Sequence, residues 1–190
     1  MKWWIIVQIV NIIADSSFFI CFLDDIQDIE PLITIIKYKD FRFIIGRIIE
    51  REINISTNFK IISSEFKENV EIFRYYNYGE IIRPFFSYEE IQKGEQEVIV
   101  ISYIHSFLES NFCAILDEIW ARKYFNDNLG QIVDKMMGTI GFIELCSYKY
   151  NIFSRQLAIN ILEEIKSSKF RIKNEIIDLT IKRLQGIDNG

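Results

Sequence analysis

Histidine and proline are almost absent from this sequence of 190 residues, which contains one histidine and two prolines. Glycine is also scarce, with eight residues, and this composition argues against collagen-like repeats, low-complexity disorder and long flexible linkers. Because His105 is the single histidine, most histidine-based metal sites are excluded, and any catalytic set of the Ser-His-Asp or Cys-His kind would depend on it. Apolar residues surround His105 at helical spacing, so we interpret it as an ordinary, partly buried side chain.

Cysteine occurs only three times, and none of Cys21, Cys113 and Cys146 belongs to a CxxC pair. Each cysteine lies in an apolar string, which is typical of buried free thiols in a reducing compartment. We therefore expect no zinc site. We do expect a cytoplasmic location.

Long apolar runs are missing as well, because no stretch approaches the ~20 residues that a membrane-spanning helix requires. Lys2 and the apolar segment 3–13 imitate a secretion signal, but Gln8 and Asn11 interrupt the segment and Asp15 follows it at once. We expect this segment to form a buried strand that ends at a carboxylate, with a signal peptide as the alternative. No association with a membrane is expected.

Positive charge is in deficit, since 22 lysines and arginines face 27 aspartates and glutamates for a net charge of −5. No global basic field attracts nucleic acid to such a chain. A polyanionic partner would have to meet a local patch of lysine and arginine, or metal ions.

Apolar patterning predicts strands that alternate with helices along one domain of residues 1–190. Short continuous apolar runs predict buried strands at 5–14, 41–45 and 112–116. Helical spacing predicts helices at 16–23, 29–38, 47–53, 87–110, 120–126, 142–150, 157–166 and 175–184. One or two short strands are expected within 54–86, and a tight turn at 138–141. This order predicts an α/β fold, a three-layer α/β/α sandwich with a central parallel sheet.

Carboxylates follow two of the predicted strands. Asp15 ends the first apolar run, and Asp117 and Glu118 follow the run 112–116. Ligands of open α/β sheets gather at the carboxyl edge of the strands, so these acids could face one another there. Carboxylate oxygens suit Mg²⁺ or Mn²⁺, and neither ion needs histidine or cysteine. The alternative is that each aspartate only caps the helix that follows it.

The order of these pieces resembles a PIN domain, a family of α/β/α metal-dependent nucleases. The family's first strand ends in Asp followed by Ser or Thr, as at Asp15-Ser16, and a later short helix carries a Glu that matches Glu52. One branch of the family adds three short motifs, and the matching segments here are GEQEVI at 94–99, LDEIWAR at 116–122 and GTIGFI at 138–143. Residues 151–190 are similar to that branch's C-terminal helical extension of a core at 1–150, including SSKFRI at 167–172.

This resemblance implies an endoribonuclease that hydrolyses RNA phosphodiester bonds with Mg²⁺ or Mn²⁺ and leaves 5′-phosphate ends. The implied catalytic residues are Asp15, Glu95, Glu97 and Asp117. The implied metal ligands are Asp15, Asp117, Glu97 and Glu118.

Four further residues have implied supporting roles. Ser16 or Thr139 would hydrogen-bond a ligand carboxylate or a metal-bound water, with turn or cap formation as the alternative. Glu52 is a further candidate for the acidic site, and Arg122 could contact substrate phosphates. Solvated surface charge and ordinary ion pairing are the simpler interpretations of these last two residues.

The resemblance also implies partners and leaves alternatives open. It implies RNA as substrate, a homodimer and, because small stand-alone PIN domains are often toxins, an antitoxin protein as partner. Gly141 stands where many PIN domains carry an acid, which keeps open a PIN-like domain that binds nucleic acid or protein without cutting. A third interpretation is an ordinary α/β regulatory or scaffold domain, in which replacing Asp15 with Asn would change stability by ~1 kcal/mol or less.

Overall fold

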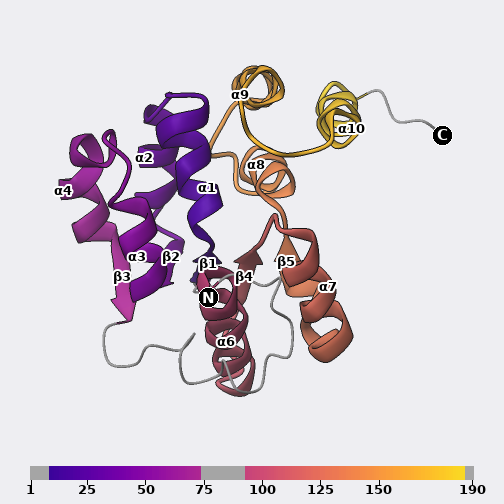
Figure 1. Ribbon diagram of the computed structural model, residues 1–190. Helices are drawn as coiled ribbons and strands as arrows, with labels where there is room; N and C mark the ends of the chain where they lie inside the picture. The colour runs from indigo at the N-terminus through magenta and orange to yellow at the C-terminus, as the bar shows by residue number, and fades with distance from the viewer. Residues whose placement is uncertain (1–8, 74–92, 187–190) are drawn as a thin grey trace, which may run out of the picture.

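The computed structural model of this chain describes residues 9–73 and 93–186, and its centre is a parallel β-sheet. Five strands run in the order β3-β2-β1-β4-β5, and every neighbouring pair is parallel (Figure 1). Their bounds are β1 Val10–Ala14, β2 Phe41–Gly46, β3 Val70–Phe73, β4 Phe112–Ile115 and β5 Met136–Met137. The α/β fold with a central parallel sheet is thus confirmed.

Burial on both faces explains why the central strands read as continuous apolar runs. All four residues of β4 are buried, and in β1 only Asn11 is more than slightly exposed. A parallel sheet needs a helical layer on each face, so its strands cannot alternate apolar and polar residues. The predicted strand at 5–14 falls partly outside the described residues, which begin just before β1.

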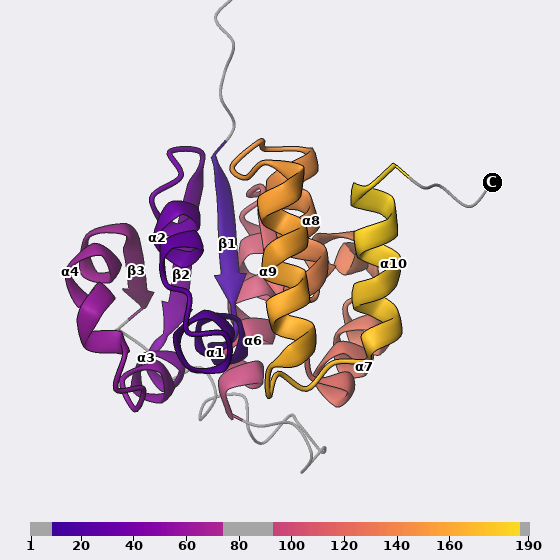
Figure 2. The same cartoon turned by 90° about the horizontal axis from the view of Figure 1, so that it is seen from above.

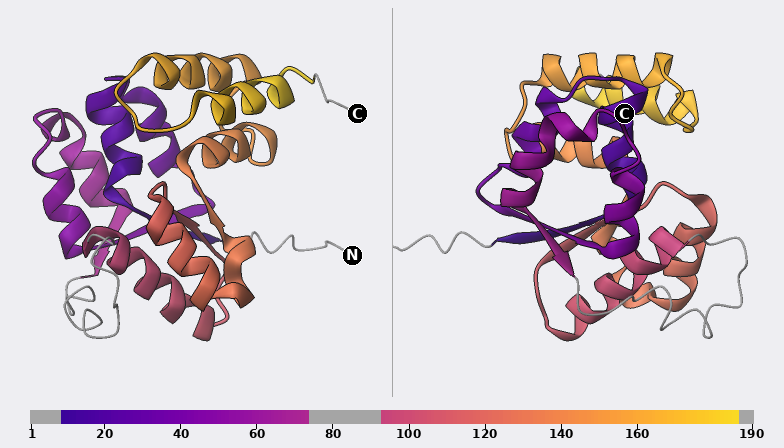
Figure 3. Two further views of the ribbon diagram at one scale, coloured as in Figure 1. Left: turned by 45° about the vertical axis from the view of Figure 1, so that its right-hand side comes forward. Right: turned by 60° about the vertical axis from the view of Figure 1, so that its left-hand side comes forward.

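Helices cover the sheet on both sides (Figures 1 and 3). α6 and α7 lie against one face, and α1, α2 and α8 lie against the other. Their bounds, with those of the remaining helices, are α1 Ser16–Ile20, α2 Glu30–Ile36, α3 Arg47–Ile53, α4 Phe59–Asn69, α6 Lys93–Phe107, α7 Ile119–Asn128, α8 Thr139–Tyr148, α9 Arg155–Ser167 and α10 Asn174–Leu184. A π-helical turn at Cys21–Asp25 continues α1, and a 3₁₀ helix at Gly130–Lys135 precedes β5.

Phenylalanine rings hold the layer of α1 and α8 on the sheet. Phe18 of α1 stacks on Phe43 of β2 with ring centroids 5.9 Å apart. Phe142 of α8 meets the edge of Phe18 at 5.6 Å and lies 5.7 Å from Phe41. Such pairs add about 0.5–1.5 kcal/mol each beyond the apolar area that they bury. The layer that carries the start of α1 and of α8 is therefore firmly fixed to the sheet.

The strand order places a topological switch between β1 and β4. From β1 the chain moves to β2 and β3 on one side, and then crosses to β4 and β5 on the other. The connections after β1 and β4 consequently leave in opposite directions, and a crevice opens at the carboxyl ends of these two strands. Open α/β sheets bind their ligands at such a crevice.

Two C-terminal helices form a further layer outside α8. α9 and α10 pack against each other and against α8, and Figure 2 shows them side by side. The helices predicted at 157–166 and 175–184 are therefore present, and they are packed on the core. None of the described helices is long and apolar enough to cross a membrane.

Most predicted elements are present, and two predictions were wrong in part. Within 54–86 the structure has β3, but the residues before it form the helix α4, with Phe59, Ile62 and Phe66 buried on one stripe. The segment 74–86 lies outside the described residues. The expected tight turn at 138–141 is instead the start of α8, for which Gly138 is the N-cap residue.

Candidate functional site

Asp15 and Asp117 meet at the switch between β1 and β4. Asp15 directly follows β1, and its backbone N–H donates to Ile115 O at 3.1 Å, which extends the pairing of the two strands. Ser17 links the two carboxylates: its backbone N–H donates to Asp15 Oδ2 and its hydroxyl to Asp117 Oδ2, each at 3.4 Å. The two acids predicted at the strand ends therefore lie together at the carboxyl edge of the sheet, between β1 and β4.

Thr139 fixes the carboxylate of Asp117. Its backbone N–H donates to Asp117 Oδ1 at 2.9 Å, and its hydroxyl donates to Oδ2 at 2.5 Å. Both donors lie at the first residue of α8, where the backbone N–H groups lack helical partners and the helix dipole favours an anion. The predicted hydrogen bond from Thr139 to a carboxylate is present, and a role beside a metal ion stays a prediction.

Glu52 and Glu95 reach the same place from other elements. Glu95 lies in the first turn of α6 and is 7% exposed. Gly94 lies between Glu52 and Asp15: a methyl group on its Cα would stand 2.8 Å from Glu52 Oε2 and 3.1 Å from Asp15 Oδ1. The absence of a side chain at position 94 thus allows these two carboxylates to approach the backbone of α6.

A pocket of about 650 Å³ opens on these acids. The carboxylates that line it, here called the acidic pocket, are Asp15, Asp25, Glu95, Asp117 and Glu118. Lys169 and Arg171, from the connection between α9 and α10, line the same pocket. Gly141 does not line it, and a Cβ there would contact only Met137, so the acids gather without a side chain at position 141.

Burial and mutual repulsion raise the pKa values of these acids. Burial, with the neighbouring charge of Glu52, raises the pKa of Asp15 to about 6. Burial, with the charges of Asp15, Glu52 and Glu118, raises the pKa of Glu95 to about 8. Burial also raises the pKa of Asp117, although the Thr139 donors and the charge of Arg122 oppose the rise. The positive side chains of the pocket are therefore too few to stabilise the ionised forms of all its carboxylates.

The predicted residue Glu97 lies elsewhere. Its side chain is fully buried at the start of α3, where Oε2 accepts from the backbone N–H groups of Ile48 at 3.0 Å and Ile49 at 3.2 Å. Gly46, the residue before α3, leaves room for it, because a Cβ at that position would overlap the Glu97 carboxylate at 2.1 Å. The structure places Glu97 outside the acidic pocket, and it holds the first turn of the helix that carries Glu52.

Of three more predicted residues, two line the acidic pocket and the third lines a neighbouring one. Glu118 is the N-cap residue of α7 and accepts from Ala121 N at 2.6 Å, so it both caps this helix and lines the pocket. Ser16 lines the pocket, and its backbone N–H bonds to the Asp15 carboxylate. Arg122 lies near enough to Asp117 to lower its pKa, but lines a neighbouring pocket.

The donor atoms have the chemistry that Mg²⁺ and Mn²⁺ require. All the acids here are carboxylates, and Asp15 Oδ1 is buried and accepts no hydrogen bond from any described residue. A divalent cation would satisfy this oxygen and relieve the repulsion that raises the pKa values. In residues 9–73 and 93–186, however, no group of three or more Asp, Glu, His or Cys side chains is already arranged to hold a metal ion. The donor types thus fit such an ion, although their present positions do not form a finished coordination group.

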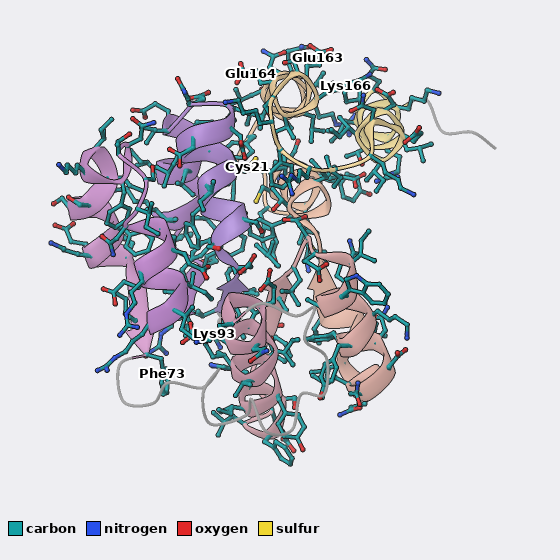
Figure 4. The ribbon with its side chains drawn as sticks, in the orientation of Figure 1. Cys21, Phe73, Lys93, Glu163, Glu164 and Lys166 are labelled. Carbon is teal, nitrogen blue, oxygen red and sulfur yellow. The ribbon has the colours of Figure 1, made fainter. Side chains whose placement is uncertain are left out.

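The single histidine lies far from the acidic pocket, and the three cysteines are buried. His105 is near the end of α6, ten residues after Glu95 and hence about 15 Å along the helix, and its Nδ1 pairs with Ser110 Oγ at 2.8 Å. The three cysteines are free and buried, and burial raises the pKa of the Cys113 thiol to about 12. Cys21, the first residue of the π-helical turn, is labelled in Figure 4, and burial together with the nearby charges of Asp117 and Asp25 raises its pKa. The expectation of buried, free thiols is confirmed.

Sequence reasoning missed four polar residues of the pocket, namely Ser17, Asp25, Lys169 and Arg171. Ser17 follows the predicted Asp15-Ser16 pair directly, so an alternative hydroxyl was visible in the sequence. Asp25 ends the π-helical turn, a deviation from the α-helix that shifts which side chains face the pocket. No local pattern indicates that Lys169 and Arg171 meet these acids, because their approach depends on how α9 packs on α8.

Comparisons with known proteins leave the family open. No family model matches the sequence, and neither a curated protein nor a solved structure was found to match it. Membership of the PIN-domain family therefore stays a prediction from motifs, and the function is argued from the pocket.

Proposed function

We propose that this chain is a ribonuclease of the PIN type that depends on Mg²⁺ or Mn²⁺ and hydrolyses RNA phosphodiester bonds. The observation that carries the proposal is the meeting of Asp15 and Asp117, with Glu95 and Glu118, at the switch point of a parallel sheet. A bound divalent cation would supply a water of lowered pKa and would neutralise charge that develops on the phosphate.

The residues of the chain would divide the work as follows. Asp15, Asp117, Glu95 and Glu118 would hold the cation, and Glu52 lies close enough to Asp15 to join them. Thr139 and Ser17 would orient the Asp117 carboxylate, because both donate to its Oδ2. Glu97 would act as a positioning residue: its carboxylate accepts from the backbone of α3 and so holds the helix that carries Glu52.

RNA as substrate, a homodimer and an antitoxin partner rest on the family resemblance. A toxin of a toxin–antitoxin pair that acts in the cytoplasm is consistent with the three free buried cysteines. A local positive surface for a polyanion is supported by Lys169 and Arg171 beside the acids.

The test is cleavage of total RNA by the purified protein with Mn²⁺, with Mg²⁺ and with EDTA. The proposal predicts fragments that need the metal and that disappear in Asp15→Asn and Asp117→Asn. Asp134→Asn is the matched control, because it removes one carboxylate from an exposed position outside the pocket. Fragments that persist in both pocket variants, or that form equally well in EDTA, would contradict the proposal.

A second candidate is a PIN-like module that binds RNA without cutting it. The absence of a finished three-acid group among the described residues favours this candidate. It predicts that RNA binds but stays intact under every metal condition. The cleavage assay and a parallel binding assay on the same preparation separate the two functions.

A further inference from the structure

The connection between α9 and α10 alternates apolar and basic side chains. Phe170 and Ile172 are partly buried against the core, whereas Lys169, Arg171 and Lys173 are exposed. The apolar residues thus attach the segment to the core, and the three positive charges stay accessible to a ligand.

Hydrogen bonds fix the backbone of this segment. The Ser168 hydroxyl accepts from Phe170 N at 3.0 Å and donates to Ile165 O at 2.8 Å, which ties the segment to the end of α9. Ile172 N then donates to Phe170 O at 3.0 Å. The basic side chains thus project from an anchored backbone, so little backbone entropy opposes their binding of a ligand.

The segment lies at the same end of the molecule as the acidic pocket. Figure 2 shows the α9–α10 connection at the end where the β1 arrow points, next to α1. Arg171 lines both the acidic pocket and a second pocket of about 670 Å³, here called the basic pocket. Asp117 and Ile119 also line both, so the two pockets adjoin, and the pair is here called the groove.

Charge is divided along this groove. In the acidic pocket five carboxylates face Lys169 and Arg171. In the basic pocket the cations outnumber the acids, with Arg122, Lys123, Arg171 and Lys173 against Asp117 and Asp127. The groove thus runs from a negative end, suited to cations, to a positive end, suited to anions.

Two of the three positive charges of the loop lack acidic partners within the described residues, whereas Lys169 lies near enough to Asp25 to lower its pKa. Lys123 pairs with Asp127, and Lys166 pairs with Asp178. Neither Arg171 nor Lys173 forms an ion pair or a side-chain hydrogen bond with any residue in 9–73 or 93–186. The outward face of α9 differs, because Glu163, Glu164 and Lys166 mix both signs there (Figure 4).

We propose that Arg171 and Lys173 bind backbone phosphates of an RNA strand that lies along the groove, next to the phosphate held at the acidic pocket. This inference rests on the proposed function and adds the path of the substrate. A strand of regularly spaced phosphates matches a groove in which the negative end takes a cation and the positive end takes phosphate directly. Arginine forms two parallel hydrogen bonds with a carboxylate as well as with a phosphate, so this geometry does not choose between an acidic peptide and RNA. The phosphates of a strand differ in following one another at regular spacing along the backbone, and we therefore commit to RNA.

The test measures binding rather than cleavage. A short fluorescein-labelled single-stranded RNA is titrated with the full chain carrying Asp15→Asn, in Mg²⁺ and at several salt concentrations, and its anisotropy is followed. In that background, Arg171→Gln with Lys173→Gln should weaken binding by about tenfold and reduce the slope of log K against log salt by about 1.4, because two phosphate contacts are lost. Lys60→Gln with Lys67→Gln, which removes the same charge from exposed positions of α4, should leave both values unchanged.

Each other outcome overturns the inference. Equal losses in the loop variant and the α4 variant would mean that only net charge matters. No binding by the parent, or full binding by the loop variant, would show that the loop does not hold RNA. Displacement of the RNA by poly-glutamate as effectively as by unlabelled RNA would assign the groove to acidic peptides.

The outcomes also separate this inference from the proposed function. RNA cleavage by the wild-type chain, with binding that ignores Arg171 and Lys173, would remove the phosphate contacts and keep the nuclease. Loop-dependent binding without cleavage under any metal condition would keep the phosphate contacts and remove the nuclease.

Discussion

The two ends of the sheet differ in the charge that they bury. At the amino end the buried polar groups are neutral: Asn11 donates through its side chain to Asn111 O, and the Tyr38 hydroxyl donates to Tyr150 O at 3.3 Å. The rings of Tyr38 and Tyr150 also pack on Phe41, with centroids 4.9 Å and 4.7 Å away. The buried Ser147 hydroxyl near the end of α8 has no partner among the described residues, but it carries no charge.

At the carboxyl end, acids gather without enough positive charge to stabilise them. Burial raises the pKa values of Asp15, Glu95 and Asp117, and one oxygen of Asp15 has no partner among the described residues. Such an arrangement costs folding free energy, which a bound cation would offset. The comparison teaches that the amino end is built from neutral groups and rings and the carboxyl end from acids, which supports the proposed cation site.

The largest expected effect concerns activity at the carboxyl end. Asp15→Asn should lower metal-dependent RNA cleavage by at least about a hundredfold, because a charged oxygen is lost from the cation site. The melting temperature of the metal-free protein should stay the same or rise, because the variant relieves repulsion by Glu52 and Glu95. Cleavage rates and thermal melting in EDTA measure both effects; a clear loss of stability with unchanged activity would indicate a simple helix cap.

The amino end should give the opposite result. Phe41→Ala should lower the free energy of unfolding by about 3–5 kcal/mol, because it removes a buried ring that packs on Tyr38, Phe142 and Tyr150. Urea unfolding measures the loss. At a temperature where the variant is folded, its cleavage rate should match that of the wild type, and a selective loss of activity would break the division between the two ends.

The pH dependence of stability should reveal the acidic pocket. The folded state holds protons on Asp15 and Glu95 up to pH values near 6 and 8, whereas the unfolded chain releases them near pH 4. The contribution of Asp15 and Glu95 to the free energy of unfolding is therefore fully present below about pH 4, and it is lost as the pH rises through 6 and 8.

Thermal melting in EDTA between pH 5.5 and 8.5 tests this dependence. The melting temperature of the wild type should fall with rising pH more steeply than that of Asp15→Asn with Glu95→Gln. Parallel curves for the two proteins would show that these acids are not the source of the dependence.

A smaller effect is expected at Gly94. Gly94→Ala should lower cleavage by about tenfold, because its methyl group would displace the Glu52 and Asp15 carboxylates from their present positions. Stability should change little, since both carboxylates end flexible side chains and alanine favours a helix. Gly130→Ala, where a Cβ meets nothing within 4 Å, is the matched control, and equal cleavage by the two variants would contradict the account.

Much of the fold could be predicted from the sequence, because strands that are buried on both faces appear in it as continuous apolar runs. The runs before Asp15 and Asp117 predicted β1 and β4, and the acids that end them predicted the site. The helix α4 was missed although Phe59, Ile62 and Phe66 repeat at helical spacing, because residues 54–86 were interpreted as one alternating stretch. The short β5 has two residues, too few for any periodic signal.

Part of the candidate site was predictable in principle, and part was not. Glu95 and Glu97 are two residues apart on one helix, so their side chains point about 200° apart and cannot both face one pocket. This geometry agrees with the position of Glu97 outside the pocket lining, although its carboxylate lies near enough to Glu52 for that charge to raise its pKa, and its role as a ligand stays a prediction. The approach of Lys169 and Arg171 to the acids depends on tertiary packing of α9 and α10, which leaves no local trace in the sequence.

Calorimetric titration of the metal-free protein with Mn²⁺ tests the central claim most directly, that the acids at the carboxyl end form a cation site. The account predicts saturable binding that releases protons, because Asp15 and Glu95 must ionise, so the measured heat should depend on the ionisation enthalpy of the buffer. Binding should vanish in Asp15→Asn with Asp117→Asn and persist in Asp134→Asn. No binding by the wild type, or equal binding by the pocket variant, would contradict the account.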